Sequence, residues 1–326
     1  MLTVKEAADR LRAWNNILIL THIRPDGDTV GCAAALCAGL RAMGKTAFLL
    51  SNDGLTDTTR PYFAPYALPS IGGNAEDASF IPDKIVSVDI ATENLFPKNA
   101  ESYKGRVDLA VDHHPSFEGF AKENIVRPQA AACGEVLYDI LSELGPITPE
   151  IALPLYVAIS TDCGCFAYGN TTAHTHAVAA ALMRTGIDFQ TVNKVFFRTK
   201  TRLRMQLESA MLREAVFYDR DRVVVMSVPR SLMERLHATE DDAEDLSALG
   251  PQIAGVDCAV TMRELEPDEW KISLRTGPRV NASAVCAAFG GGGHAAAAGC
   301  TIKASFYEAR RRILNEVAKL TVEEFT

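Results

Sequence analysis

The sequence of 326 residues lacks the features that mark membrane proteins, disulfide-rich secreted proteins and small zinc domains. No apolar run approaches the roughly 18 residues of a membrane-spanning helix, and segment 1–10 is charged, unlike a secretory signal. The eight cysteines form no Cys-x-x-Cys pair, and most stand among small apolar residues, as buried free thiols do. We therefore expect a cytoplasmic protein that does not bind membranes.

The chain also has fewer basic than acidic residues. The chain carries 33 Lys and Arg against 41 Asp and Glu, which gives a net charge of −8. Binding to a long nucleic acid depends on many phosphate contacts from basic side chains. The excess of acidic residues therefore argues against binding along a long strand. A short nucleotide held by a few arginines and a metal ion remains compatible with it.

The first half of the chain alternates between short apolar runs and helical patterns. Helices are expected over 29–43, with Thr29 as the N-cap, over 134–144, and from 148 to about 162. Strands are expected at 17–20, 47–50, 85–88 and 109–111. This alternation predicts an α/β fold with a mostly parallel sheet and helices on both faces.

The second half of the chain has a different composition and a different pattern of predicted elements. Residues 189–215 are rich in basic residues and helix formers, which predicts a helical connector. Beyond it, strands are expected near 222–228, 259–262 and 270–275, and a helix near 280–289 leads into the run Gly290-Gly291-Gly292-Gly293-His294. The chain is long enough for two domains, and this pattern predicts a second, smaller α/β domain.

Side chains that can bind a metal ion follow three of the predicted strands. His22, Asp26 and Asp28 follow the first, Asp89 follows the third, and Asp112-His113-His114 follow the fourth, while Asp162 ends a predicted helix. Open parallel sheets place ligands at the carboxyl ends of their strands. Carboxylates and imidazoles without a thiolate suit Mn²⁺, Mg²⁺ or Fe²⁺. Such a set is too large for one ion, whereas two ions about 3.5–4 Å apart would use it fully.

The glycines near these motifs have a physical role as well. Gly27 is expected to allow the tight turn that directs Asp26 and Asp28 toward one centre. The later run of four glycines exposes backbone N–H groups and permits close approach by a phosphate or a base.

These motifs, in this order, resemble the DHH–DHHA1 phosphoesterase family, and within it the compact members that act as nanoRNase and 3′-phosphoadenosine 5′-phosphate phosphatase. The resemblance covers most of the chain, from His22-x-x-x-Asp26-x-Asp28 to Gly290–His294 with Ala298-Gly299. It implies a DHH catalytic domain over 1–188, a helical linker over 189–215 and a DHHA1 substrate-binding domain over 216–326.

The resemblance also implies roles for individual residues. Two divalent ions, Mn²⁺ first among the candidates, would be held by His22, Asp26 and Asp89 and by Asp28, Asp89, His113 and Asp162, with Asp89 as the bridge. Asp112 would orient a ligand imidazole, and His114 would protonate the leaving group or stabilise the phosphoryl oxygens. Substrate would bind through Arg275, Gly291, Gly292, Gly293 and His294.

The implied reaction is hydrolysis of short RNA or DNA fragments, or of a nucleoside bisphosphate, to nucleoside monophosphates in a cleft between the domains. One alternative is the same chemistry on cyclic dinucleotides or their linear dinucleotide products. An alternative of another class is a regulatory nucleotide-binding module without catalysis. Ala167 and Ala295 stand where relatives commonly carry arginine or another polar residue, which leaves the substrate open. The sequence also leaves open whether the chain forms a homodimer.

Overall fold

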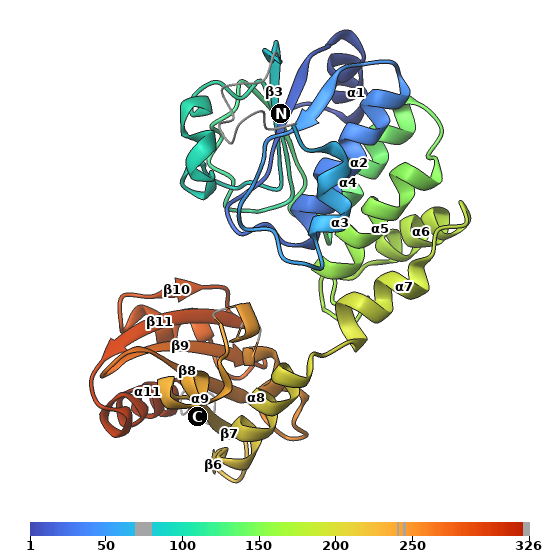
Figure 1. Ribbon diagram of the computed structural model, residues 1–326. Helices are drawn as coiled ribbons and strands as arrows, with labels where there is room; N and C mark the ends of the chain where they lie inside the picture. Colours follow the sequence, from blue (N-terminus) through green and yellow to red (C-terminus); the bar gives the residue numbers. More distant parts are fainter. Residues whose placement is uncertain (69–79, 240, 244–245, 322–326) are drawn as a thin grey trace. The chain divides into compact units, whose positions relative to one another are not determined.

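The computed structural model describes residues 1–68, 80–239, 241–243 and 246–321. The chain divides into two compact units, Met1–Thr199 and Lys200–Thr326, and each has its own hydrophobic core (Figure 1). Segment 189–215, predicted as a connector, is shared between them. Its first helix, α7 (Phe189–Asn193), packs on unit 1, and α8 (Arg202–Arg213) packs on unit 2. The residues between them include a π-helical turn, Lys194–Arg198.

Unit 1 is built around a parallel five-stranded sheet with the order β2-β1-β3-β4-β5. The chain direction across the sheet reverses between β1 and β3, and ligands bind at such a switch point in open α/β folds. The strands are β1 (Ile17–Leu20), β2 (Ala47–Leu49), β3 (Lys84–Val88), β4 (Leu109–Asp112) and β5 (Glu123–Val126). The predicted α/β fold is confirmed, with β5 as an additional edge strand.

The two faces of this sheet are covered differently. One face packs against α-helices, including α2, which is buried over nearly its whole length and lies beside α5 (Figure 1). The other face packs Leu18 and Leu20 against Phe96 and Ala100, from a region of short 3-10 helices at Glu93–Leu95 and Lys98–Tyr103. Among the described residues, the helices expected on this face are therefore short 3-10 turns and not α-helices. The α-helices of unit 1 are α1 (Val4–Ala13), α2 (Gly27–Ala42), α3 (Arg60–Phe63), α4 (Cys133–Leu144), α5 (Pro149–Asp162), α6 (Ala173–Met183) and α7.

The start of α2 corrects one prediction. The N-cap is Asp26 and not Thr29, because the Asp26 carboxylate accepts the N–H groups of Asp28 and Thr29. Thr29 is one turn deeper, and its hydroxyl donates to the carbonyl of Val88 at 3.0 Å. The helix therefore begins earlier than expected, and Thr29 ties it to the end of β3.

Unit 2 contains a six-stranded sheet with the order β10-β11-β9-β8-β7-β6, antiparallel except between β7 and β8. One face packs against α10 (Ala282–Ala287) and α11 (Phe306–Thr321), and the other against α8 and α9 (Arg230–Leu236). This confirms the smaller α/β domain. Its strands are β6 (Val216–Tyr218), β7 (Val223–Val228), β8 (Cys258–Glu266), β9 (Glu269–Thr276), β10 (Gly292–Gly293) and β11 (Ala297–Lys303).

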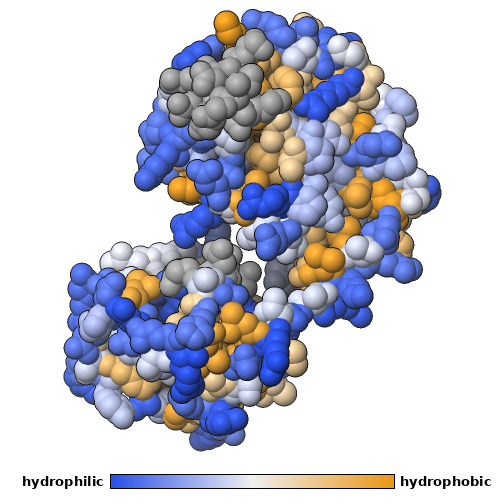
Figure 2. All heavy atoms as spheres, in the orientation of Figure 1, coloured by the Kyte–Doolittle hydropathy of each residue, from blue (hydrophilic) through white to orange (hydrophobic). Residues whose placement is uncertain are grey.

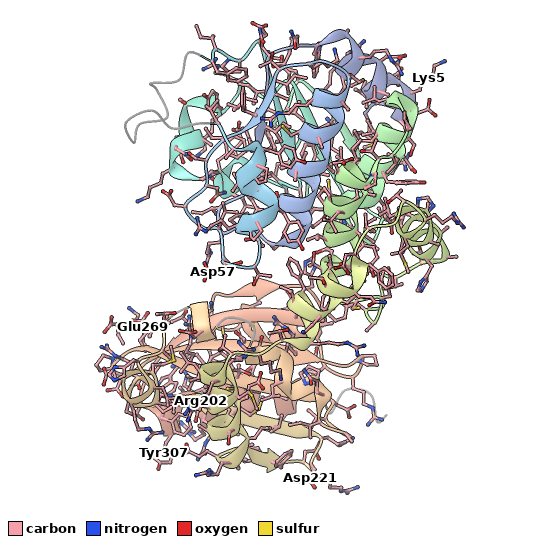
Figure 3. The ribbon with its side chains drawn as sticks, turned by 45° about the vertical axis from the view of Figure 1, so that its right-hand side comes forward. Lys5, Asp57, Arg202, Asp221, Glu269 and Tyr307 are labelled. Atoms are coloured by element: carbon pink, nitrogen blue, oxygen red, sulfur yellow. The ribbon has the colours of Figure 1, made fainter. Side chains whose placement is uncertain are left out.

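The visible surface of each unit is mostly hydrophilic, with apolar side chains in scattered patches (Figure 2). Individual apolar side chains are exposed, such as Met205 on α8 and Tyr307 on α11, the latter labelled in Figure 3. Of the helices that the structure describes, none is both long enough and apolar enough to cross a membrane.

Candidate metal and catalytic site

All six side chains predicted as metal ligands come together at the carboxyl ends of β1, β3 and β4. They are His22, Asp26 and Asp28 from the β1–α2 connection, Asp89 after β3, His113 after β4, and Asp162 at the end of α5. His22, Asp26 and Asp89 place ligand atoms within 4.8 Å of one another. Asp28, His113 and Asp162 form a second group with the same spacing. Each group could therefore hold one cation.

Asp89 lies between the two groups. Its Oδ1 is 3.6 Å from Nε2 of His113, and its Oδ2 is 3.9 Å from Nε2 of His22. Its backbone adopts the left-handed conformation, with φ at 57°, which is uncommon outside glycine and often found at functional sites. The two oxygens of this one carboxylate thus face different ligand groups.

The two histidines that point into the cluster are each held through Nδ1 by a backbone carbonyl. Nδ1 of His22 lies 2.9 Å from the carbonyl of Ile23, and Nδ1 of His113 lies 3.1 Å from the carbonyl of Ala130. A carbonyl oxygen can only accept, so each Nδ1 carries a proton, and Nε2 is the ring atom that faces the carboxylates. Burial alone would lower the pKa of His22, but its contact with Asp26 raises that pKa. Burial, together with the neighbouring His114, lowers the pKa of His113 and favours its neutral form.

The buried carboxylates form an electrostatically unfavourable group on their own. Burial and the repulsion from Asp162 and Asp26 raise the pKa of Asp28 well above its usual range. Burial and neighbouring aspartates do the same for Asp89, and they raise the pKa of Asp162 to about 7. Within the described part of the chain, no hydrogen-bond donor reaches the buried Oδ1 of Asp89. Divalent cations would remove this repulsion and supply the missing partner, so the donor set fits them.

Asp112 and His114 form a separate pair beside the cluster. The fully buried Asp112 accepts hydrogen bonds at Oδ1 from Nδ1 of His114, at 2.8 Å, and from two backbone N–H groups. This hydrogen bond with Asp112 raises the pKa of His114. His114 Nδ1 is also 3.5 Å from Asp89 Oδ1, and His114 could form a third ligand group with Asp89 and His113. The geometry thus allows His114 either to transfer a proton or to bind a metal.

Close packing beneath the cluster explains Gly27. A Cβ atom on Gly27 would lie 2.3 Å from the hydroxyl oxygen of Thr161, the residue before Asp162. The glycine allows the first turn of α2 to approach the end of α5, which brings Asp26 and Asp28 toward Asp162. Its φ is not in the left-handed region, so close approach explains this glycine better than the tight turn that we expected.

Two supporting asparagines carry no recognisable signal in the sequence. Asn52 is buried, and its Nδ2 donates to the hydroxyl of Thr21 and to the carbonyl of His22. Asn170 donates to the carbonyl of Asp162 at 3.1 Å and to that of Ala131 at 2.9 Å. Three of these four bonds join residues that are 30, 31 and 39 positions apart, and only the folded chain reveals them.

The predicted substrate-binding residues gather at one corner of the second sheet. Ala297 on β11 stands opposite Arg275 on β9, and Ala297 also exchanges backbone hydrogen bonds with His294. Gly292 and Gly293 form β10 and are exposed, as is His294. Gly291 packs so closely against Gly299 and Cys300 that a Cβ atom would clash. Arg279, in the connection after β9, is 3.3 Å from a carboxylate oxygen of Asp257.

Comparison with known proteins identifies two domains in the chain. The DHH family N-terminal domain matches residues 16–159, and the DHHA1 domain matches residues 223–323. The chain belongs to the DHH–DHHA1 family. The family resemblance read from the motifs is therefore confirmed.

Similar proteins and structures extend this finding. The bifunctional oligoribonuclease and PAP phosphatase NrnA of Thermus thermophilus is 28% identical, over 92% of this chain and 89% of its own. The protein of the same name from Bacillus subtilis is 23% identical, over 95% and 96%. An exopolyphosphatase-related protein from Bacteroides fragilis shares the fold, with a TM-score of 0.83, 20% identity and coverage of 98% of this chain and 96% of its own. The exonuclease RecJ bound to manganese shows a more distant likeness, with a TM-score of 0.50 and 13% identity over 100% of this chain and 96% of its own.

These findings fix the reaction class. The chain is a hydrolytic phosphoesterase, as the family and its relatives are. The prediction of an enzyme is confirmed at this level.

Proposed function

We propose that this protein is a two-metal phosphoesterase that hydrolyses short oligonucleotides and 3′-phosphoadenosine 5′-phosphate to nucleoside monophosphates. The observation that carries the proposal is the meeting of two ligand groups at one buried carboxylate, Asp89. The names of the relatives, which are oligoribonucleases and PAP phosphatases, support the choice of substrates.

In this proposal, His22, Asp26 and Asp89 hold one ion. The second ion is held by Asp28, Asp89, His113 and Asp162. Mn²⁺ is our first choice, because mixed carboxylate and imidazole ligands without thiolate suit it, with Mg²⁺ and Fe²⁺ as the alternatives. When bound, a pair of such ions activates water and stabilises the attacking and leaving oxygens of a displacement at phosphorus.

The other side chains orient groups and move protons. His114, held through Nδ1 by Asp112, keeps Nε2 for donation to the oxygen of the leaving nucleotide. Asp112 is completely buried and fixes the orientation of this imidazole. This replaces our expectation that Asp112 orients a ligand imidazole, because Nδ1 of the ligand His113 lies at the carbonyl of Ala130 instead. The backbone carbonyls of Ile23 and Ala130 orient His22 and His113 through Nδ1, so that Nε2 of each ring is the atom directed at the proposed ions.

The second domain, in our proposal, binds the part of the substrate away from the reacting phosphate. Arg275 would pair with a phosphate or stack on a base. The exposed backbone of Gly292 and Gly293, with His294 and the neighbouring Gly291, would admit a nucleotide closely. Residues 1–188 would then be the catalytic domain, 189–215 the linker and 216–326 the substrate-binding domain. The acidic net charge favours short substrates over long strands.

A substrate panel with Mn²⁺ tests this proposal. Labelled dinucleotide, longer RNAs, 3′-phosphoadenosine 5′-phosphate, a cyclic dinucleotide and pyrophosphate are incubated with the protein, and the products are separated. We expect release of nucleoside monophosphates from the dinucleotide and the bisphosphate, more rapidly than from long RNA. Faster turnover of the cyclic dinucleotide would favour the alternative substrate class. Binding without hydrolysis of any substrate would favour a regulatory module and contradict the proposal.

A further inference from the structure

Asp28 is the most constrained carboxylate in the cluster. It is buried in the core, and its oxygens accept three hydrogen bonds. Oδ1 accepts from the thiol of Cys32 at 3.1 Å and from the backbone N–H of Gly134 at 3.0 Å, whereas Oδ2 accepts from the N–H of Cys133 at 2.7 Å. A carboxylate has about four acceptor positions. These bonds therefore leave one position, on Oδ2, for a further partner.

The three donors come from two helices. Cys32 lies one turn beyond Asp28 on α2, which places both side chains on the same face of that helix. Cys133 and Gly134 are the first two residues of α4, whose N-cap, Ala132, offers no side-chain acceptor. The free N–H groups at the start of a helix need an acceptor and favour a negative charge. Asp28 supplies that acceptor from a segment more than a hundred residues away.

Close helix packing brings these groups together. A Cβ atom on Gly31 would lie 2.3 Å from the carbonyl oxygen of Pro154, and one on Gly134 would lie 2.8 Å from Cβ of Ala158. These glycines therefore let α2 and α4 approach α5 more closely than larger residues would. Figure 1 shows the three helices side by side in unit 1. Asp28 is buried where these closely packed helices meet.

We propose that Cys32, together with the first turn of α4, is a positioning device that fixes Asp28 as a ligand with one available oxygen, Oδ2. The inference rests on the proposed function, in which Asp28 binds the second ion. Nε2 of His113 lies 3.8 Å from Oδ2, so the remaining lone-pair position is on the oxygen that faces the other ligands of that ion. Cys32 thus acts through Asp28, without touching substrate or metal.

Cys37 provides a matched control. It is a second buried cysteine on α2, and its thiol donates to the carbonyl of Ala47 at 3.2 Å. Substitution of Cys37 removes a thiol hydrogen bond from the same helix without touching the metal cluster. Packing effects on α2 should therefore appear in both cysteine variants, whereas a positioning effect should appear at Cys32 alone.

The experiment is a Mn²⁺ titration of the whole protein, with free Mn²⁺ followed by electron paramagnetic resonance. Cys32→Val keeps a side chain of similar size but removes the donor, whereas Cys32→Ser keeps a donor. We expect Cys32→Val to weaken one of the two Mn²⁺ equivalents by about 10- to 100-fold, the usual effect of losing a group that orients a ligand. Cys32→Ser and Cys37→Val should bind both equivalents as the wild type does. Cys32→Ala, which is the smaller substitution, provides the same test if the valine variant does not fold.

The outcomes separate this inference from the proposed function. If the wild type binds two equivalents and Cys32→Val binds them equally tightly, the positioning role is wrong and the proposed function stands. An equal loss in Cys37→Val would show a general packing effect and would also overturn the positioning role. If the wild type itself binds no Mn²⁺, the two-metal proposal is wrong. The inference about Cys32 is then wrong as well, because it depends on that proposal.

Discussion

The two units of the molecule place their candidate functional groups in opposite environments. In unit 1 carboxylates and imidazoles from four chain segments meet in a largely buried cluster, where Asp28 and Asp89 are almost inaccessible. In unit 2 the corresponding candidates are a half-buried arginine at the end of β9, an exposed histidine and the exposed glycine backbone of the edge strand β10. Charges interact strongly where water is excluded and weakly where it is not. The first environment suits bond breaking, and the second suits recognition of a varied partner.

This contrast leads to an expected division of kinetic effects. A group that acts only in the transition state changes kcat, whereas a group that binds ground state and transition state equally changes KM. Substitutions in the cluster of unit 1 should therefore affect metal content and kcat. Substitutions at the sheet edge of unit 2 should mainly affect KM.

The largest effect is expected for Asp89→Ala. Both ligand groups lose an oxygen at once, so turnover should fall by more than about 10⁴-fold, beyond the usual contribution of a single acid–base group. Steady-state hydrolysis of a dinucleotide and metal analysis provide the measurement. Asp108→Asn is the control, because Asp108 is also nearly buried but pairs with Lys84 and Lys122 away from the cluster. Near-normal turnover of Asp89→Ala with two bound metal equivalents would show that Asp89 is no bridge.

A smaller effect is expected for His114→Ala. The variant should keep both metal equivalents, and kcat should fall by about 10²- to 10⁴-fold, the range for loss of a general acid. Metal content is measured beside kcat, because His114 also lies near Asp89. Loss of one whole equivalent would assign His114 as a ligand and leave the proton donor to be found elsewhere.

The smallest effect is expected in unit 2, for Arg275→Ala. Loss of one charge-assisted contact costs about 1.5–3 kcal/mol, so KM should rise at least about tenfold while kcat changes little. Arg279→Ala is the matched control, since the Arg279 guanidinium is already paired with Asp257. A fall in kcat at unchanged KM would remove the proposed distinction between the units.

The sequence predicted the parts of the fold that have strong local patterns. β1, β3 and β4 are continuous apolar runs, and their ends deliver the cluster residues as expected. β5 and β11 were not predicted, because Glu123–Val126 is half polar and Ala297–Lys303 begins with small residues that have little strand preference. Their strand conformation comes from pairing with β4 and β9.

The candidate site shows the same limit. The six cluster residues could be found because each belongs to a short motif at the end of an element. Cys32 and the N–H groups of Cys133 and Gly134 could not, because they meet Asp28 only after α2 and α4 pack together. A backbone donor has no residue signature, and a cysteine among alanines indicates only a buried position.

A Mn²⁺ titration with parallel measurements of bound metal and of dinucleotide hydrolysis tests the central claim most directly. The two ligand groups that share Asp89 predict two bound equivalents, magnetic coupling between them in the resonance spectrum, and hydrolysis that rises with the second equivalent. Hydrolysis that saturates at one equivalent, or that persists after complete removal of metal, would contradict a two-metal site.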